Sequence, residues 1–290
     1  MTARTNFDRL AARLNDACVK VAHLDTAHWI TNNYNAYGRL FNLVQRRNVA
    51  LTGSIRLIEH NSAIENADLA TVLGNTFTME SYTYANKPIY RIPISSPIEY
   101  GWQKRDINAI RHNYLWFGSA GFVHKGLDLV LELFAGLPDY QLFVCGPLHK
   151  EKAFVQEFHC ELLETENIHP VGWVDINGAK FKEMLNQCLG IIYPSCAEGG
   201  GGSVIDCMRA GVIPVVSYEA SVDVNGNGVT LKDCSLPEMH KAVTRVSDLP
   251  SSELEDMARE TWQSASSTHS KASFAQKYRE FVLNVLLQSD

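Results

Sequence analysis

The chain has 290 residues, of which 46% are hydrophobic and 20% are charged, a composition typical of a folded globular protein with one or two domains. Its 26 basic and 32 acidic residues give a net charge of -6, which argues against nucleic-acid binding by the whole chain. The seven cysteines form no C-x-x-C pair, so neither a disulfide framework nor a zinc site is predicted. No segment has the apolar length of a signal peptide or a membrane span, so we expect a cytoplasmic protein.

The first 95 residues carry weak and mixed patterns. Apolar residues at helical spacing predict helices, and short apolar runs bounded by glycine or polar residues predict strands. The predicted elements are helices over 6–20, 34–47 and 63–66, a loop over 23–33, and strands over 69–73 and 89–94.

Periodicity is lost after this part of the chain. Pro97, Gly101 and mixed charge fall in one stretch, which is typical of a connection between domains. We therefore predict a partial N-terminal domain over 1–95 and a linker over 96–112.

Strand and helix patterns alternate beyond residue 113. Each apolar run is continuous and is followed by a helical pattern, as a parallel sheet covered on both faces requires. Right-handed crossovers then predict a doubly wound α/β sheet whose ligand crevice lies at the carboxyl ends of the strands. Strands are expected over 114–117, 141–145, 168–171, 190–193 and 213–217, helices near 126–136, 150–166, 178–188 and 203–210, and two or three surface helices over 250–287.

The most informative segment reads IIYPSCAEGGGGSVIDCMRAGVIPVVS and ends at Ser217. A buried strand is expected to end at Tyr193, and a loop with Glu198 and four glycines leads into a helix opening near Ser203. Consecutive glycines let the backbone approach a ligand closely, and a helix start offers unpaired amides to an anion such as a diphosphate. A glycine run after a strand is as often a flexible turn, so both interpretations stay open.

Glu198 and Asp206 lie at the two ends of this glycine segment, and A-G-V-I-P-V-V-S follows it. With these motifs, residues 113–217 resemble the donor-binding domain of GT-B fold glycosyltransferases of the glycosyl transferases group 1 type (family 4-like). The resemblance implies a Rossmann-like domain over 113–270, a shortened, incomplete α/β N-terminal domain, and a C-terminal helix over 271–290 that packs back on it.

The same resemblance implies roles for the segment's residues. Glu198 would face the hydroxyls of the donor sugar. Asp206, in the place of the family's second glutamate, would hold the ribose. The groups expected to line the sugar and the diphosphate are Gly200, Gly201, Gly202 and Ser203.

A second match is F-G-S-A-G-F-V-H-K-G-L-D-L, which ends at Leu129. By the resemblance, Lys125 neutralises the donor diphosphate, with Gly121 and His124 beside it in the turn. The family's arginine after the first glycine is absent, because Ser119 and Ala120 stand there. The resemblance therefore implies one side-chain cation plus backbone amides for the diphosphate. A lysine beside a glycine at a helix start is otherwise usually exposed to solvent.

The turn at Gly172, Trp173 and Val174 falls where the family contacts the nucleobase through backbone groups. It could equally be an ordinary strand end of a Rossmann-like sheet. We include these three residues among the expected nucleotide contacts.

Two weaker clusters lie in the first 95 residues. His23, Asp25 and His28 have a spacing that could ligate a metal or orient a hydroxyl, although we favour a surface loop. A basic cluster could touch acidic lipid or an anionic acceptor, although charges on an exposed helix usually mean solvation only. Its members are Arg39, Arg46, Arg47 and Arg56.

The sequence therefore predicts a hexosyltransferase-type enzyme with Lys125 and Glu198 as its catalytic residues. The expected substrates are a UDP- or GDP-linked sugar and an acceptor, with retention of configuration and with neither metal nor cofactor. A sugar-nucleotide-binding pseudoenzyme that works with a partner and a nucleotide-sugar epimerase are the alternatives. A homodimer and a peripheral membrane contact stay open, and no nucleic acid is expected.

Overall fold

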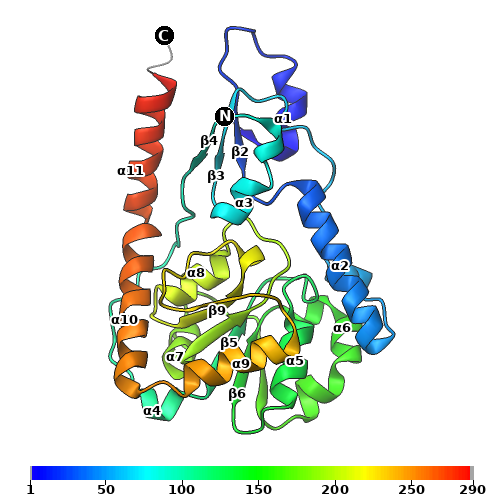
Figure 1. Cartoon of the computed structure of the whole chain (residues 1–290), viewed down its shortest axis with the longest axis vertical. Coiled ribbons are helices and arrows are strands. Elements are labelled where there is room, and N and C mark those ends of the chain that lie inside the picture. Colours follow the sequence, from blue (N-terminus) through cyan, green and yellow to red (C-terminus); the bar gives the residue numbers. More distant parts are fainter. Residues whose placement is uncertain (1, 288–290) are drawn as a thin grey trace.

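The computed structural model describes residues 2–287, so the last three residues of the expected C-terminal helix, 288–290, lie outside it, as does residue 1. Two lobes stand one above the other, and both contain a parallel sheet (Figure 1). We refer to the lobe with the N-terminus as the first lobe and to the larger one as the second lobe.

The first lobe is a four-stranded parallel sheet in the order β1-β2-β3-β4. Its strands are β1 (Thr2–Ala3), β2 (Val21–Leu24), β3 (Leu69–Val72) and β4 (Ile89–Arg91), and its helices are α1 (Arg4–Ala11), α3 (Thr76–Glu80) and the 3-10 turn η2 (Thr83–Ala85). The 3-10 turn η1 (Thr52–Ser54), which follows α2 (Trp29–Arg47), lies against the second lobe, where Ser54 hydrogen-bonds Glu151.

Three sequence predictions for this lobe are wrong. The expected loop over 23–33 contains the end of β2 and the start of α2. Strand β2 has only four residues, one of them a histidine, so its apolar pattern is too short to read. Helix α1 ends at Ala11 rather than at residue 20, and 63–66 form a turn.

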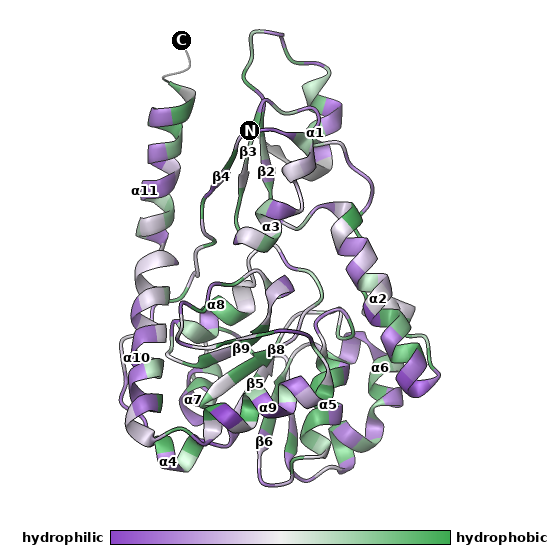
Figure 2. Ribbon diagram, in the orientation of Figure 1, coloured by the Kyte–Doolittle hydropathy of each residue, from purple (hydrophilic) through white to green (hydrophobic). Residues whose placement is uncertain are grey.

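The second lobe is a six-stranded parallel sheet in the order β10-β9-β8-β5-β6-β7. Figure 2 shows apolar residues concentrated on its strands and on α5, as burial on both faces requires. The strands are β5 (Asn113–Phe117), β6 (Gln141–Cys145), β7 (Ile168–Gly172), β8 (Gly190–Tyr193), β9 (Ile213–Ser217) and β10 (Val229–Leu231). The helices are α4 (Ile107–Ile110), α5 (Leu127–Ala135), α6 (Lys152–Glu157), α7 (Ala179–Gln187), α8 (Gly202–Met208), α9 (Leu236–Ser247) and α10 (Ser251–Thr268), with the short turns η3 (Leu148–Lys150), η4 (Cys160–Glu164) and η5 (Tyr218–Ala220).

Helix α2 leaves the first lobe and runs down the side of the second (Figure 1). Leu40 and Leu43 are buried in the core of the second lobe. Arg46 contacts Asp128 at 2.5 Å and also pairs with Glu132. These contacts make the C-terminal half of α2 part of the second lobe.

The arginines predicted to form one exposed basic cluster do not do so. Arg47 lies 2.9 Å from Glu132, pairs with Glu161 and covers the ring of Phe158. Arg39 is buried, and Arg56 stands alone on the loop after α2. Arg46 and Arg47 are thus held by carboxylates of the second lobe, and a peripheral membrane contact stays a prediction.

The C-terminal helix α11 (Lys271–Phe281), extended by η6 (Val282–Leu286), lies beside the first-lobe sheet (Figure 1). Phe281 is buried there with Val21, Leu69 and Ile92, and Phe274 packs against them. At the junction of α10 and α11, the His269 carbonyl accepts a hydrogen bond from the Ser96 N–H at 2.9 Å. On this side of the molecule, opposite α2 (Figure 1), the linker leaves the first lobe and the C-terminal helix returns to it at one place.

Candidate functional site

The residues singled out in the second lobe lie in the loops after β5, β7 and β8, at the end of β7 and on α8. In a parallel sheet these loops all emerge at one edge, which is where ligands bind in doubly wound folds. The loop after β5 carries Gly121, His124 and Lys125, and the loop after β8 carries Glu198 and the glycines.

Lys125 and Glu198 form a buried ion pair at this edge. The Lys125 Nζ lies 2.5 Å from the Glu198 Oε1 and donates a hydrogen bond to the Tyr193 hydroxyl at 2.9 Å. Tyr193 and Ser195 donate hydrogen bonds to the same carboxylate oxygen, at 2.9 and 3.0 Å. Two motifs 73 positions apart in the sequence are thus joined in one network.

The network keeps Glu198 ionised. Burial opposes the negative charge, but the charge and the hydrogen bond of Lys125 outweigh it and lower the pKa of Glu198 to about 2. Burial and the neighbouring carboxylate raise the pKa of Tyr193 well above its ordinary value. The site therefore holds a carboxylate, an ammonium group and a neutral phenol.

His124 is fixed in one tautomer by its two neighbours. Its Nε2 lies 2.8 Å from the Ala197 carbonyl oxygen, so Nε2 carries the hydrogen, and its Nδ1 accepts a hydrogen bond from the Arg56 N–H at 3.4 Å. Burial lowers the pKa of His124 to about 4. The imidazole is therefore neutral at pH 7 and joins the loop after α2 to both site loops.

Arg56 lies against the glycine turn and was not among the residues predicted for this site. Gly121 has a φ of +96°, and a Cβ there would lie 2.8 Å from the Arg56 Cγ, so the glycine makes room for the arginine stem. Burial dominates the pKa of both His124 and Tyr193, and the Arg56 charge is near enough to lower both. Arg56 is exposed, and its guanidinium forms no ion pair within residues 2–287. It is a free cation beside the Lys125–Glu198 pair.

The glycine run brings the two lobes together. A Cβ on Gly199 would lie 2.0 Å from the Asp25 carbonyl oxygen, and one on Gly200 would lie 3.4 Å from that of Leu73. Gly201, with a φ of +54°, is the N-cap of α8. Glycine is required at position 199 because the Asp25 backbone occupies the place of a side chain. Ligand binding by Gly200, Gly201, Gly202 and Ser203 stays a prediction.

Asp206 points to other neighbours. It is buried on α8, and burial raises its pKa, opposed by a hydrogen bond from Ser96 and by the charge of Arg209. The structure therefore places this carboxylate beside the linker, and its expected contact with a ribose stays a prediction.

The turn at Gly172, Trp173 and Val174 ends the edge strand β7. Gly172 has a φ of +79°, and its carbonyl accepts a hydrogen bond from the Gly146 N–H at 2.9 Å. Val174 is buried, whereas Trp173 is 68% exposed. An exposed indole at the ligand edge of the sheet offers a stacking surface for a planar ring.

His23 and His28 are not in a surface loop, contrary to expectation. His23 lies in β2 and hydrogen-bonds the Thr71 hydroxyl, while His28 caps α2 and its Nε2 lies 2.9 Å from the Tyr84 hydroxyl. These partners hold the two imidazoles in the first-lobe fold. Within the part of the chain that the structure describes, no group of three or more histidine, cysteine, aspartate or glutamate side chains could hold a metal. In the same part, no helix has the length and apolarity needed to cross a membrane.

Solved structures share this fold at low sequence identity. Staphylococcus aureus TarM, solved with Fondaparinux, alpha-GlcNAc-glycerol and UDP, matches with a TM-score of 0.63 and 13% identity over 95% of this chain and 53% of its own. Anabaena HepE, solved with UDP-glucose, matches with a TM-score of 0.63 and 15% identity over 91% of this chain and 72% of its own. WaaG, a glycosyltransferase involved in lipopolysaccharide biosynthesis, matches with a TM-score of 0.58 and 14% identity over 96% of this chain and 80% of its own. The chain thus spans about half the length of TarM.

A search of curated proteins finds no match. The sequence profile described as glycosyl transferases group 1 matches residues 102–261, more than half of the chain and most of the second lobe. Together with the parallel sheets and the shared fold, this match identifies the chain as a member of the glycosyl transferases group 1 family with a GT-B fold.

Proposed function

We propose that the protein is a hexosyltransferase that moves a sugar from a UDP- or GDP-linked donor to an acceptor hydroxyl, with retention and without a metal ion. The observation that carries the proposal is the buried Lys125–Glu198 pair at the ligand edge of the second lobe. Two separate motifs of the family meet in that pair. The UDP and UDP-glucose in the TarM and HepE structures support a nucleotide-sugar donor.

In this proposal the second lobe stabilises the leaving diphosphate by electrostatics. The bond between the sugar and the diphosphate breaks, and the negative charge that develops on the diphosphate meets cations already in place, usually the largest contribution to catalysis. Lys125 is partly neutralised by Glu198. Arg56 therefore supplies the second, uncompensated cation, in place of the arginine missing at Ser119 and Ala120. Glu198 takes hydrogen bonds from the sugar hydroxyls.

A binding role without transfer is the second candidate. One observation favours it: the Asp25 backbone contacts Gly199 directly, where the donor sugar is expected. A protein held in this arrangement would bind a nucleotide but exclude the sugar.

Calorimetry with UDP and GDP tests the placement of the donor. We expect Lys125→Ala and Arg56→Ala each to weaken binding about tenfold or more, since each removes a charge-assisted contact. The matched control is Arg13→Ala, an exposed arginine of the first lobe, which should leave affinity unchanged. If the nucleobase stacks on Trp173, nucleotide binding should quench the tryptophan fluorescence, and the Trp173→Phe variant should lose this quenching. Unchanged affinity in both Lys125→Ala and Arg56→Ala would refute the placement.

Transfer assays with labelled nucleotide sugars separate the candidate functions. Transfer to an acceptor that persists in EDTA supports the proposal, and loss of transfer restored by manganese or magnesium refutes its metal independence. Nucleotide binding with no turnover indicates the binding role. Conversion of the donor sugar to its epimer would identify an epimerase.

A further inference from the structure

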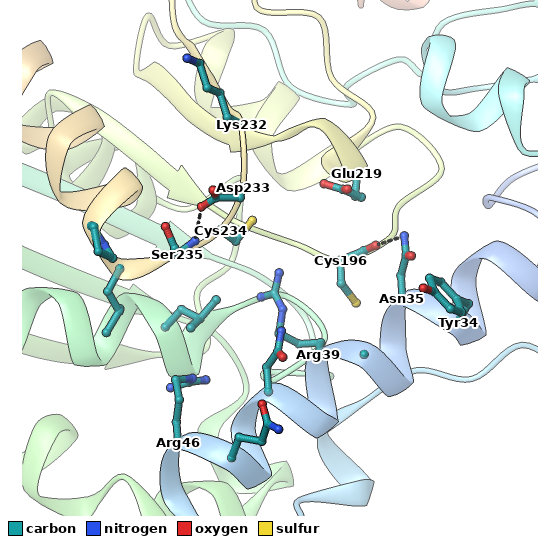
Figure 3. Close-up of a pocket in the computed structure, with 16 residues that line it drawn as sticks. Tyr34, Asn35, Arg39, Arg46, Cys196, Glu219, Lys232, Asp233, Cys234 and Ser235 are labelled. Carbon is teal, nitrogen blue, oxygen red and sulfur yellow. Dashed lines mark hydrogen bonds between the residues drawn. The ribbon is translucent and has the colours of Figure 1, made fainter.

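A cavity lies between α2 and the second lobe, next to the loop that carries Glu198. Its volume is about 730 Å³, within the usual range for small-molecule sites. Figure 3 shows residues of α2 on one side and the loop from Lys232 to Ser235 on the other. Neither Lys125 nor Glu198 lines this cavity.

The α2 wall is polar and open. Asn35, Gly38, Asn42 and Gln45 recur at three- and four-residue spacing, so they form one stripe along the helix. A Cβ added to Gly38 would meet nothing within 4 Å. The glycine thus widens the cavity. The Asn35 Nδ2 already donates a hydrogen bond to the Cys196 carbonyl at 2.9 Å (Figure 3), so Asn35 offers its amide oxygen. The amides of Asn42 and Gln45 can donate hydrogen bonds to hydroxyl groups and accept them.

Arg39, Arg46 and Lys232 are the basic residues of the lining, and of these three only Arg39 is buried. Its side chain points into the space between Cys196 and Cys234 (Figure 3) and is only 8% exposed. Its Nη1 is buried and has no hydrogen-bond partner within residues 2–287. A buried guanidinium with an unused donor is costly unless an anion accepts from it.

The carboxylates near Arg39 form no ion pair with it within residues 2–287. Asp128 gives its Oδ2 to Arg46, while its buried Oδ1 has no hydrogen-bond partner in the same residues and its charge acts on Arg39 only at a distance. Asp233 accepts a hydrogen bond from the Ser235 N–H at 2.8 Å. Glu219 lies on the wall of the cavity but forms no ion pair with Arg39. Burial alone would lower the pKa of Arg39, but the surrounding thiols and carboxylates raise it, so Arg39 stays charged.

We propose that this cavity is a second ligand site that binds a small hydroxyl-bearing anion, a sugar phosphate or a sugar acid. The phosphate or carboxylate group accepts hydrogen bonds from Arg39, and the hydroxyl groups bind the amides of Asn35, Asn42 and Gln45. This site does not depend on the proposed transferase activity, because its lining excludes the residues expected to bind the nucleotide.

Calorimetry on the full chain with four probes tests the ligand chemistry. We expect glucose 6-phosphate, glucuronate or both to bind, neutral glucose not to bind, and inorganic phosphate to bind more weakly than the sugar phosphate. Binding of only one of the two sugars would identify phosphate or carboxylate as the group recognised. Saturating UDP should not displace them. Equal binding of glucose, binding of none of the probes, or displacement by UDP would overturn the proposal.

Gly38 offers a variant that blocks the cavity without disturbing the fold. Gly38→Leu extends into empty space on a helix that favours leucine over glycine, and we expect at least a tenfold loss of affinity for the anionic sugar. Gly38→Ala is the matched control and should bind normally. Arg39→Gln should also lose binding about tenfold or more, since a charged hydrogen bond is removed. Unaltered affinity in Gly38→Leu would show that the probe binds elsewhere. UDP binding by Gly38→Leu tests the donor site separately.

Discussion

The two lobes are both parallel sheets with helices, but they differ in how they obtain their cores. The second lobe covers its six strands with its own helices, and its core is continuous. The first lobe has a small core around Leu24 and Val72 and completes the other face of its sheet with Phe281 from the far end of the chain. Burial of apolar surface is the main favourable contribution to folding. The comparison therefore predicts that the second lobe folds by itself, whereas the first lobe needs the rest of the chain to fold.

Separating the lobes is the strongest test of that difference. We expect a fragment of residues 1–95 to show no cooperative thermal transition, because it lacks α11 and the second-lobe surface that holds α2. A fragment of residues 113–270 should melt cooperatively by circular dichroism, at a lower temperature than the intact chain, because Leu40 and Leu43 no longer cover its core. A sharp transition from the first fragment would contradict this view of the two lobes.

The buried ion pair should make the second lobe sensitive to a single charge. Glu198→Gln leaves the Lys125 ammonium buried without its counter-ion, and we expect the free energy of unfolding to fall by about 3–5 kcal/mol. The double variant Lys125→Met with Glu198→Gln should recover much of that loss. Glu255→Gln, which breaks an exposed pair with Lys104, is the control and should cost less than about 1 kcal/mol. Urea denaturation measures all three, and a small loss in Glu198→Gln would argue against a buried pair.

His124 should make stability depend on pH between about 6.5 and about 4. Its folded pKa of about 4 lies below its ordinary value of 6.5, so in this window the unfolded state binds a proton that the folded state does not. Stability is therefore highest above pH 6.5 and falls by up to about 3 kcal/mol as the pH approaches 4.

Urea titrations at several pH values measure this effect. His124→Gln should flatten the curve between pH 6.5 and 4, whereas His149→Gln, at an exposed histidine, should follow the unmodified protein. Equal slopes in the two variants would exclude His124 as the source.

The strands of the second lobe could be predicted to within about a residue, because their apolar runs are continuous and each is followed by a helix. Strand β10 was not predicted, because Val229–Leu231 is too short to give a pattern. Helix α9 was not predicted either, although Met239, Val243 and Val246 recur at helical spacing. Lys125 and Glu198 were found through family motifs, but their ion pair depends on how two loops meet. Arg56 could not have been assigned to the site from sequence, because it comes from a different segment and reaches the glycine turn only in the fold.

The contact between Ser96 and His269 gives the molecule a pivot. Both chain crossings on this side pass through that point, and the His269 Nδ1 also lies 2.7 Å from the Ile94 carbonyl oxygen. Helix α2 lies on the opposite side of the molecule (Figure 1). In a rigid rotation, displacement grows with distance from the axis, so a small change in the angle between the lobes moves the pivot little and α2 most. Because the ion pairs of Arg46 and Arg47 fix the C-terminal half of α2 to the second lobe, such a rotation would have to bend the chain nearer the start of α2.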